Sequence, residues 1–174
     1  METKKLGVCL TLLLGLAGSA CTGKQDRVTG EPSAARLVST VSMNDSSAAV
    51  QLLSGFYQIE NNAWRWTAGK FSVRLPTPPG AGQKGATLSF SFTIPDVVIQ
   101  KDKNITLAAS INGMALKSVT YNAPGAYVFS ADVPASQPTA ESVTVDFALD
   151  KTMQPDGDKR ELGVIAASVG ISAR

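Results

Sequence analysis

The sequence predicts an all-β fold, an antiparallel β-sandwich, over residues 36–174. Three observations support it. Short stretches alternate apolar with polar residues, turn-forming residues separate these stretches roughly every 10 positions, and helical periodicity is nearly absent. One apolar and one polar face per strand is the pattern required when two packed sheets each bury one face.

The elements follow from this alternation in chain order. Only residues 46–53 have helix-like character, and the Asn112-Gly113 dipeptide is a strong signal for a two-residue hairpin turn. Asp146 and Asp150 fall on a polar strand face, where solvated surface carboxylates are the favoured interpretation. The expected strands cover 71–75, 88–94, 105–111, 115–121, 127–130, 143–149 and 163–171, with a Pro/Gly-rich loop at 76–85.

Residues 1–20 have the order of a secretory signal peptide. A positive start is followed by an apolar run of about 12 residues and then by small residues. The run is shorter than the ~20 residues of a membrane-spanning helix, so we expect cleavage rather than an uncleaved anchor. Residues 21–35 are polar without hydrophobic period, which predicts a flexible tether.

Cys21 follows Gly18-Ser19-Ala20 and resembles the lipobox cysteine of bacterial lipoproteins. Cys9 leaves with the leader, so Cys21 is the only thiol of the mature chain and no intramolecular disulfide can form. The resemblance implies acylation, for example by palmitate, and an outer-membrane or other envelope lipoprotein facing periplasm or exterior. The usual leucine is replaced by Gly18, which keeps ordinary cleavage and a secreted or periplasmic soluble protein as the alternative.

Charge and composition exclude several functions. The net charge is +2 for the full chain and +1 once the leader is removed, and the charges are dispersed, which disfavours nucleic-acid binding. The chain has no histidine, which excludes Ser-His-Asp and Cys-His catalysis and histidine-based metal sites. We predict no cofactor.

The segment 55–67 holds the densest chemistry, including both tryptophans. If it is a strand, Trp64 and Trp66 point to one face and Arg65 to the other. For Trp66 we favour packing in the core. For Trp64 the sequence favours neither burial in the core nor stacking on a sugar ring over the other. Tyr57 and Trp64 are the candidate ligand-binding residues.

Charged residues at two distant places are expected to meet. Glu60 and Arg65 flank the Asn61-Asn62 turn, where a structural carboxylate–guanidinium pair is favoured over a ligand grip. Asp158 and Arg160 follow the Asp156-Gly157 turn. We expect the two pairs to join the first and last strands. Calcium binding at Asp156 and Asp158 is disfavoured because the segment lacks the spacing and closing glutamate of a calcium loop, so no metal site is predicted.

Three short motifs, Gly55-Phe56-Tyr57-x-x-Glu60, Arg65-Trp66-Thr67 and Asp158-x-Arg160-x-Leu162-Gly163, together resemble a β-sandwich module of bacterial envelope proteins. Similar modules are attached to glycosyltransferases and other polysaccharide-related proteins. The resemblance covers roughly residues 54–171. It implies a jelly-roll-like fold similar to carbohydrate-binding modules and a role near surface polysaccharide, with Tyr57, Glu60, Arg65, Trp66, Asp158 and Arg160 as signature residues.

We therefore expect a non-catalytic envelope lipoprotein that binds surface polysaccharide or assists in its handling. The alternative is a structural or protein-interaction subunit of an envelope assembly or export system. A glycoside hydrolase or lyase using Glu60 and Asp158 is less favoured, because nearby basic groups would hold both carboxylates ionised. The expected partners are polysaccharide or an envelope protein, with membrane contact through the lipid anchor and no nucleic acid.

Overall fold

A computed structural model describes residues 37–174 of the chain. The predicted signal peptide, the predicted tether and Cys21, for which we expect acylation, lie outside these residues. Within the described part, none of the helices has both the length and the apolar character needed to cross a membrane.

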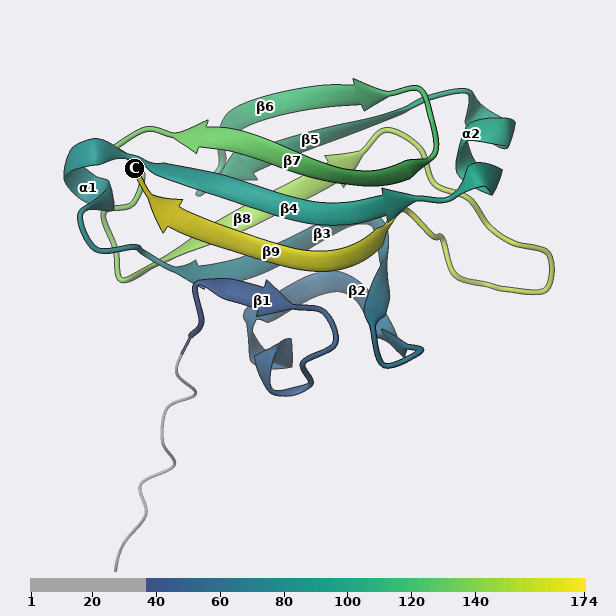
Figure 1. Cartoon of the computed structure of the whole chain (residues 1–174), viewed down its shortest axis with the longest axis horizontal. Coiled ribbons are helices and arrows are strands. Elements are labelled where there is room, and N and C mark those ends of the chain that lie inside the picture. Colours follow the sequence, from purple (N-terminus) through teal and green to yellow (C-terminus); the bar gives the residue numbers. More distant parts are fainter. Residues whose placement is uncertain (1–36) are drawn as a thin grey trace, which may run out of the picture. The chain divides into compact units, whose positions relative to one another are not determined.

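Strands dominate the described chain, and all of their pairings are antiparallel. Two short α-helices and one 3-10 helix sit in the connections (Figure 1). In chain order the elements are β1 (Thr40–Ser42), η1 (Ser47–Gln51), β2 (Leu52–Glu60), β3 (Trp64–Pro76), α1 (Ala81–Lys84), β4 (Ala86–Ile94), α2 (Asp96–Asp102), β5 (Ile105–Ile111), β6 (Met114–Tyr121), β7 (Gly125–Val133), β8 (Ser142–Leu149) and β9 (Ile165–Ala173).

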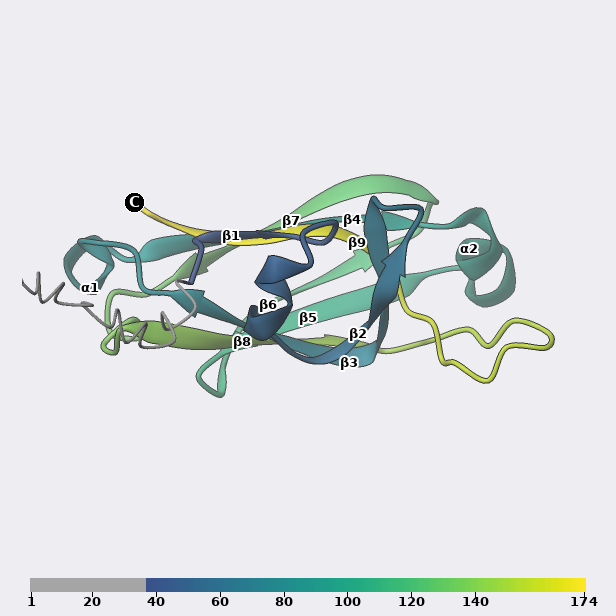
Figure 2. The same cartoon turned by 90° about the horizontal axis from the view of Figure 1, so that it is seen from below.

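The strand order confirms the predicted sandwich and is that of a jelly roll. One hydrogen-bonded path runs β6-β5-β8-β3-β9-β4-β7, with β1 added to β9 and β2 to β3. The strands β4, β7 and β9 lie with β1 in one layer, and β3, β5 and β8 lie in the other (Figure 2). Most connections from β3 to β9 cross from one layer to the other, and two packed antiparallel sheets connected in this way form the double-sheet jelly roll.

Strand β3 belongs to both layers because its two ends have different partners. Arg65 and Trp66 pair with β9, whereas residues 70–76 pair with β8. The strand therefore changes layer near Gly69. This bend places the aromatic start of β3 at one end of the sandwich and its alternating second half in the middle of a sheet.

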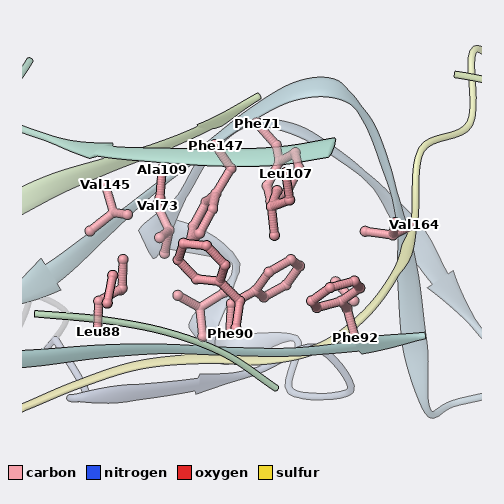
Figure 3. Close-up of a cluster of buried hydrophobic side chains, with 14 of the residues drawn as sticks. Phe71, Val73, Leu88, Phe90, Phe92, Leu107, Ala109, Val145, Phe147 and Val164 are labelled. Carbon is pink, nitrogen blue, oxygen red and sulfur yellow. The ribbon is translucent and has the colours of Figure 1, made fainter. Parts of the chain in front are cut away.

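The core fills the space between the layers and contains a cluster of phenylalanine rings among aliphatic side chains (Figure 3). Phe71 of β3 stacks on Phe147 of β8, with ring centroids 5.0 Å apart. Phe90 of β4 contacts Phe147 from the opposite layer at 4.9 Å and stacks on Phe92 at 4.8 Å. These rings lie on the apolar faces that the alternation predicted, and each such ring buries on the order of 150–250 Å².

Candidate functional site

Arg160 is the centre of a charged network that joins the loop before β9 to strand β2. Its Nη1 donates a hydrogen bond to Glu60 Oε1 at 2.9 Å. Its Nε and Nη2 donate to the carboxylate of Asp158, the shorter bond being 2.7 Å. The expected contact between the two distant segments is therefore confirmed for Glu60 with Arg160.

The same network engages Tyr57. The Tyr57 hydroxyl donates to the backbone carbonyl of Glu161 at 3.0 Å. The Arg160 guanidinium carbon lies 5.3 Å from the centre of the Tyr57 ring, within the range of a cation–π contact. Tyr57 is thus held by its own chain at both its ring and its hydroxyl.

Electrostatics in this network follow from the hydrogen bonds of Arg160. They lower the pKa of Asp158 below its usual value, because the bonded guanidinium favours the ionised carboxylate. The carboxylates of Asp158 and Glu60 in turn raise the pKa of Arg160. Both acids of the proposed hydrolase pair are therefore bonded to one arginine, the opposite of what a general acid requires.

The prediction of an ion pair between Glu60 and Arg65 is wrong. Arg65 is 7% exposed, and its guanidinium donates to backbone carbonyls, from Nε to Met43 at 3.2 Å and from Nη1 to Tyr57 at 2.9 Å. The reason is the cover supplied by β2 and the chain after β1. Those segments present carbonyl oxygens to Arg65, so that it ties them to β3 without a carboxylate.

The two tryptophans share one face of β3, as predicted, but that face is the less buried one. Arg65 and Thr67 point to the buried side, while Trp64 and Trp66 are half-buried. Trp66 packs against the hydrophobic core. The indole N–H of Trp64 is enclosed and has no hydrogen-bond partner among residues 37–174. The aromatic residues therefore do not form a freely exposed stacking surface.

Two glycines of the motifs are required by close backbone approach. Gly55 has φ +73°, and a Cβ there would overlap the backbone of Lys70 and Phe71 on β3. A Cβ at Gly163 would lie 2.7 Å from Thr67 Oγ1. The Gly163 N–H donates to the Thr67 carbonyl at 2.7 Å, so the loop before β9 can lie directly against β3 only without a side chain.

The Asp158 oxygens that a cation would need are engaged by the Arg160 side chain and its backbone N–H. Asp156 is exposed. Across residues 37–174, no three carboxylate, cysteine or histidine side chains come together as a metal would require.

A hollow of about 290 Å³ lies on the outer face of the β3-β8-β5-β6 layer. One cross-strand row runs through it, in which Asp146 of β8 stands directly between Ser72 of β3 and Ser110 of β5. The row continues to Ser54 of β2 and Ala115 of β6. The hollow exists because these outward side chains are small.

The hollow has a polar rim and an apolar floor. Ala108 and Ala148 lie beside each other across β5 and β8, and both line it together with Phe71 and Phe147. Lys70 is exposed at its edge, and the Lys70 ammonium and Asp146 carboxylate form no ion pair within the described residues. A cation and an anion are therefore both available to a bound molecule.

A second hollow of about 470 Å³ adjoins the first and is also lined by Lys70. Its other side is formed by the start of the loop after β8, at Lys151 and Thr152, and by Glu161. Glu161 is the residue whose carbonyl accepts the Tyr57 hydroxyl. The Arg160 network therefore meets this hollow only through Glu161, the neighbour of Arg160 in the chain.

The residues of the first hollow were not singled out from the sequence as a site. Lys70, Ser72 and Ser110 look like ordinary solvent-facing positions of alternating strands, and Asp146 was expected to be a solvated carboxylate. Only the pairing of β3, β8 and β5 places them in one row. The available signal was the unusual smallness of the polar faces, with serine and alanine at successive outward positions.

No family model matches this chain, and no curated protein gives a significant match. Several solved structures are similar at a low level. Dimeric latent PorU from Porphyromonas gingivalis has a TM-score of 0.39 at 13% identity, covering 60% of this chain and 10% of that chain. The CBM36-1 domain of a multidomain xylanase from the hindgut metagenome of Trinervitermes trinervoides has a TM-score of 0.39 at 11% identity, covering 75% and 94%.

A third similar structure contains CBM51-2 of ZmpB from Clostridium perfringens, in complex with GlcNAc and INT domains. Its TM-score is 0.39 at 10% identity, and the match covers 78% of this chain and 28% of that chain. The fold assignment therefore rests on the strand order of the chain itself.

Proposed function

We propose that this protein is a non-catalytic envelope protein whose jelly roll binds surface polysaccharide, or assists in its handling, on the outer face of the β3-β8-β5-β6 layer. The first hollow is the observation that carries the proposal. It combines an apolar floor with hydroxyl groups, one ammonium and one carboxylate.

These features suit a sugar ring. A pyranose has C–H faces that pack on apolar surface and a rim of hydroxyls that both donate and accept hydrogen bonds. The alanine floor serves the first, and Lys70, Asp146 and the serines serve the second. Tyr57 and Trp64 are less suited, because Arg160 occupies the Tyr57 ring and Trp64 is half-buried.

A non-catalytic role is supported by the bonding of the acidic residues. Glu60 and Asp158 are the pair that glycoside hydrolysis would use, and Arg160 bonds to both. Asp146 stands in its row between two serines, which leaves it without a second carboxylate for acid–base work.

The envelope location is part of the proposal and rests on residues 1–35. A secretory leader and acylation at Cys21 would anchor the domain to a bacterial membrane through its tether. Feeding cells labelled palmitate tests this directly. Label on the wild type and none on Cys21→Ser supports the lipoprotein, whereas no label on either leaves a soluble periplasmic or secreted protein.

Binding is tested with the soluble domain, residues 36–174, on an array of bacterial polysaccharides. Asp146→Asn should lower affinity about tenfold, since a charge-assisted hydrogen bond contributes about 1.5–3 kcal/mol. Ala108→Trp should abolish binding by filling the floor. Asp132→Asn, an exposed carboxylate on β7 outside the hollow, is the matched control and should bind like the wild type. Absence of binding to every polysaccharide would refute the proposal.

Protein interaction is a second candidate, favoured by one exposed apolar position. Val128 on β7 is 67% exposed and borders a hollow of about 240 Å³ formed with Phe92 and Tyr127. A photocrosslinking residue placed at Val128 in cells should capture one defined envelope protein if this candidate holds. The same residue at Ser118 on β6 is the control.

A further inference from the structure

We infer that the two hollows form one track, in which an extended sugar chain of neutral or amino sugars lies across Lys70, with its far end positioned by the Arg160 network. The inference rests on the proposed function and deepens it. It specifies the length of the ligand, its charge class and the role of the signature residues.

The two hollows are neighbours, because they share one lining residue. Lys70 lines both hollows, and it lies next to Gly69, which lines the second. The first hollow alone, at about 290 Å³, is just below the ~300–1,000 Å³ typical of ligand sites. The second adds about 470 Å³, so the joined track accommodates a ligand longer than the first hollow holds.

The charges along the track define the ligand class. Asp146 borders the first hollow, Lys70 stands at the junction, and Glu161 borders the second, where its exposed carboxylate has no partner among residues 37–174. The second hollow also contains Lys151, whose ammonium donates to the Asn104 side chain at 2.6 Å and to the Asn104 carbonyl at 3.0 Å. These neutral acceptors fix its position and leave its positive charge in place.

Two lysines, Lys70 and Lys151, therefore face three carboxylates, because Asp150 also lines the second hollow. The Asp150 Oδ1 accepts a hydrogen bond from the Thr106 N–H at 2.6 Å. Repulsion between like charges disfavours a polyanionic ligand such as a polyuronate. Hydroxyl groups and ammonium groups are both good donors to these carboxylates. The net negative charge of the lining thus favours neutral sugars and amino sugars over acidic polysaccharides.

The Arg160 network fixes the position of Glu161, which forms one side of the second hollow. Arg160 precedes Glu161 and is bonded to Glu60 on β2, while the Tyr57 hydroxyl holds the Glu161 carbonyl at 3.0 Å. On the other side, Leu162 and Met153 exchange two backbone hydrogen bonds of 2.7 and 2.8 Å. These bonds hold the backbone on both sides of Glu161, so Arg160 and Tyr57 are positioning residues for the second hollow.

The test is calorimetric titration of the soluble domain with oligosaccharides from disaccharide to hexasaccharide. Three series are used as probes: chitosan oligomers, their fully N-acetylated counterparts and oligogalacturonates. We expect affinity for the first two series to rise about tenfold or more with length, and oligogalacturonates to bind weakly or not at all. Lys70→Met should weaken binding of all bound lengths, with Lys117→Met on β6 as the matched control.

Arg160→Met and Tyr57→Phe separate positioning from general stability. Each should lower the affinity for the hexasaccharide more than that for the disaccharide. Tyr57→Phe keeps the ring and removes only the hydroxyl, so it tests the contact even if Arg160→Met folds poorly.

The outcomes distinguish the two proposals. If no polysaccharide and no oligosaccharide binds, the proposed function itself fails. If sugars bind with an affinity that is independent of length, or that Lys70→Met leaves unchanged, the track is refuted while sugar binding stands. Preferential binding of oligogalacturonates would overturn the charge class.

Discussion

The guanidinium of Arg160 and the carboxylate of Glu60, separated by 100 positions in the chain, lie 2.9 Å apart and connect the loop before β9 to the end of β2. Both side chains are about one third exposed. The pair joins two distant segments at one end of the jelly roll, next to Glu161, which lines the second hollow, so its main effect is geometric.

Removal of this pair should therefore cost little stability. We expect Glu60→Gln to lower the free energy of unfolding by about 0–1 kcal/mol, because partly exposed ion pairs are screened by water and salt. Urea denaturation at low and high salt measures this. A double-mutant cycle with Arg160→Met should give a coupling that shrinks as salt rises; a coupling unaffected by salt would contradict the account.

Asp158 should contribute to the acid sensitivity of the fold. Arg160 holds its pKa in the folded protein below that in the unfolded chain, so its stabilising effect is present above the unfolded value of about 3.9. That effect is lost as pH falls through the lower folded pKa. Asp158→Asn should flatten the decline in melting temperature below about pH 4 relative to Asp146→Asn, because the Asp146 carboxylate has no arginine bond among residues 37–174.

Arg65 should be more important for stability than its position in a polar motif indicates. It is buried and bonded to two carbonyls on separate segments. Arg65→Lys should lower the free energy of unfolding by about 1–3 kcal/mol, since one ammonium cannot reproduce the two-sided geometry and a buried carbonyl loses its donor. Chemical denaturation measures it, with exposed Arg74→Lys on the same strand as the control.

Gly163→Ala should be destabilising by about 1–3 kcal/mol through overpacking against β3. The added methyl group would meet Thr67 Oγ1 and the Leu149 side chain. Gly82→Ala in α1 is the matched control, because its nearest contact would be an ordinary 3.8 Å. Equal melting temperatures for the two variants would show that the close approach at Gly163 is not limiting.

The strands that alternation predicted are those with one fully buried face. In β4 every second residue is buried, so the two-residue hydrophobic period was visible in the sequence. The buried residues include Leu88, Phe90, Phe92 and Ile94. Strand β2 gave no such period, because its pairing with β3 shifts register three times between Leu52 and Ile59. Helix α2 was missed because it has only seven residues after Pro95, too few to show a helical period.

The candidate site was only partly predictable for a related reason. The contact of Glu60 with Arg160 was anticipated from motif chemistry, but the burial of Arg65 depends on cover from segments elsewhere in the chain. The row Ser72–Asp146–Ser110 depends on the register of three strands that are far apart in sequence. The sequence of a single strand does not indicate which of its outward-facing residues will lie beside those of another strand.

The central claim is that polysaccharide binds the sheet face and not the aromatic segment. NMR titration of the isotope-labelled domain with an array-positive polysaccharide tests it most directly. The account predicts that amide shifts concentrate at Lys70, Ser72, Asp146 and Ser110. Shifts concentrated at Tyr57 and Trp64, with the sheet face unchanged, would contradict it.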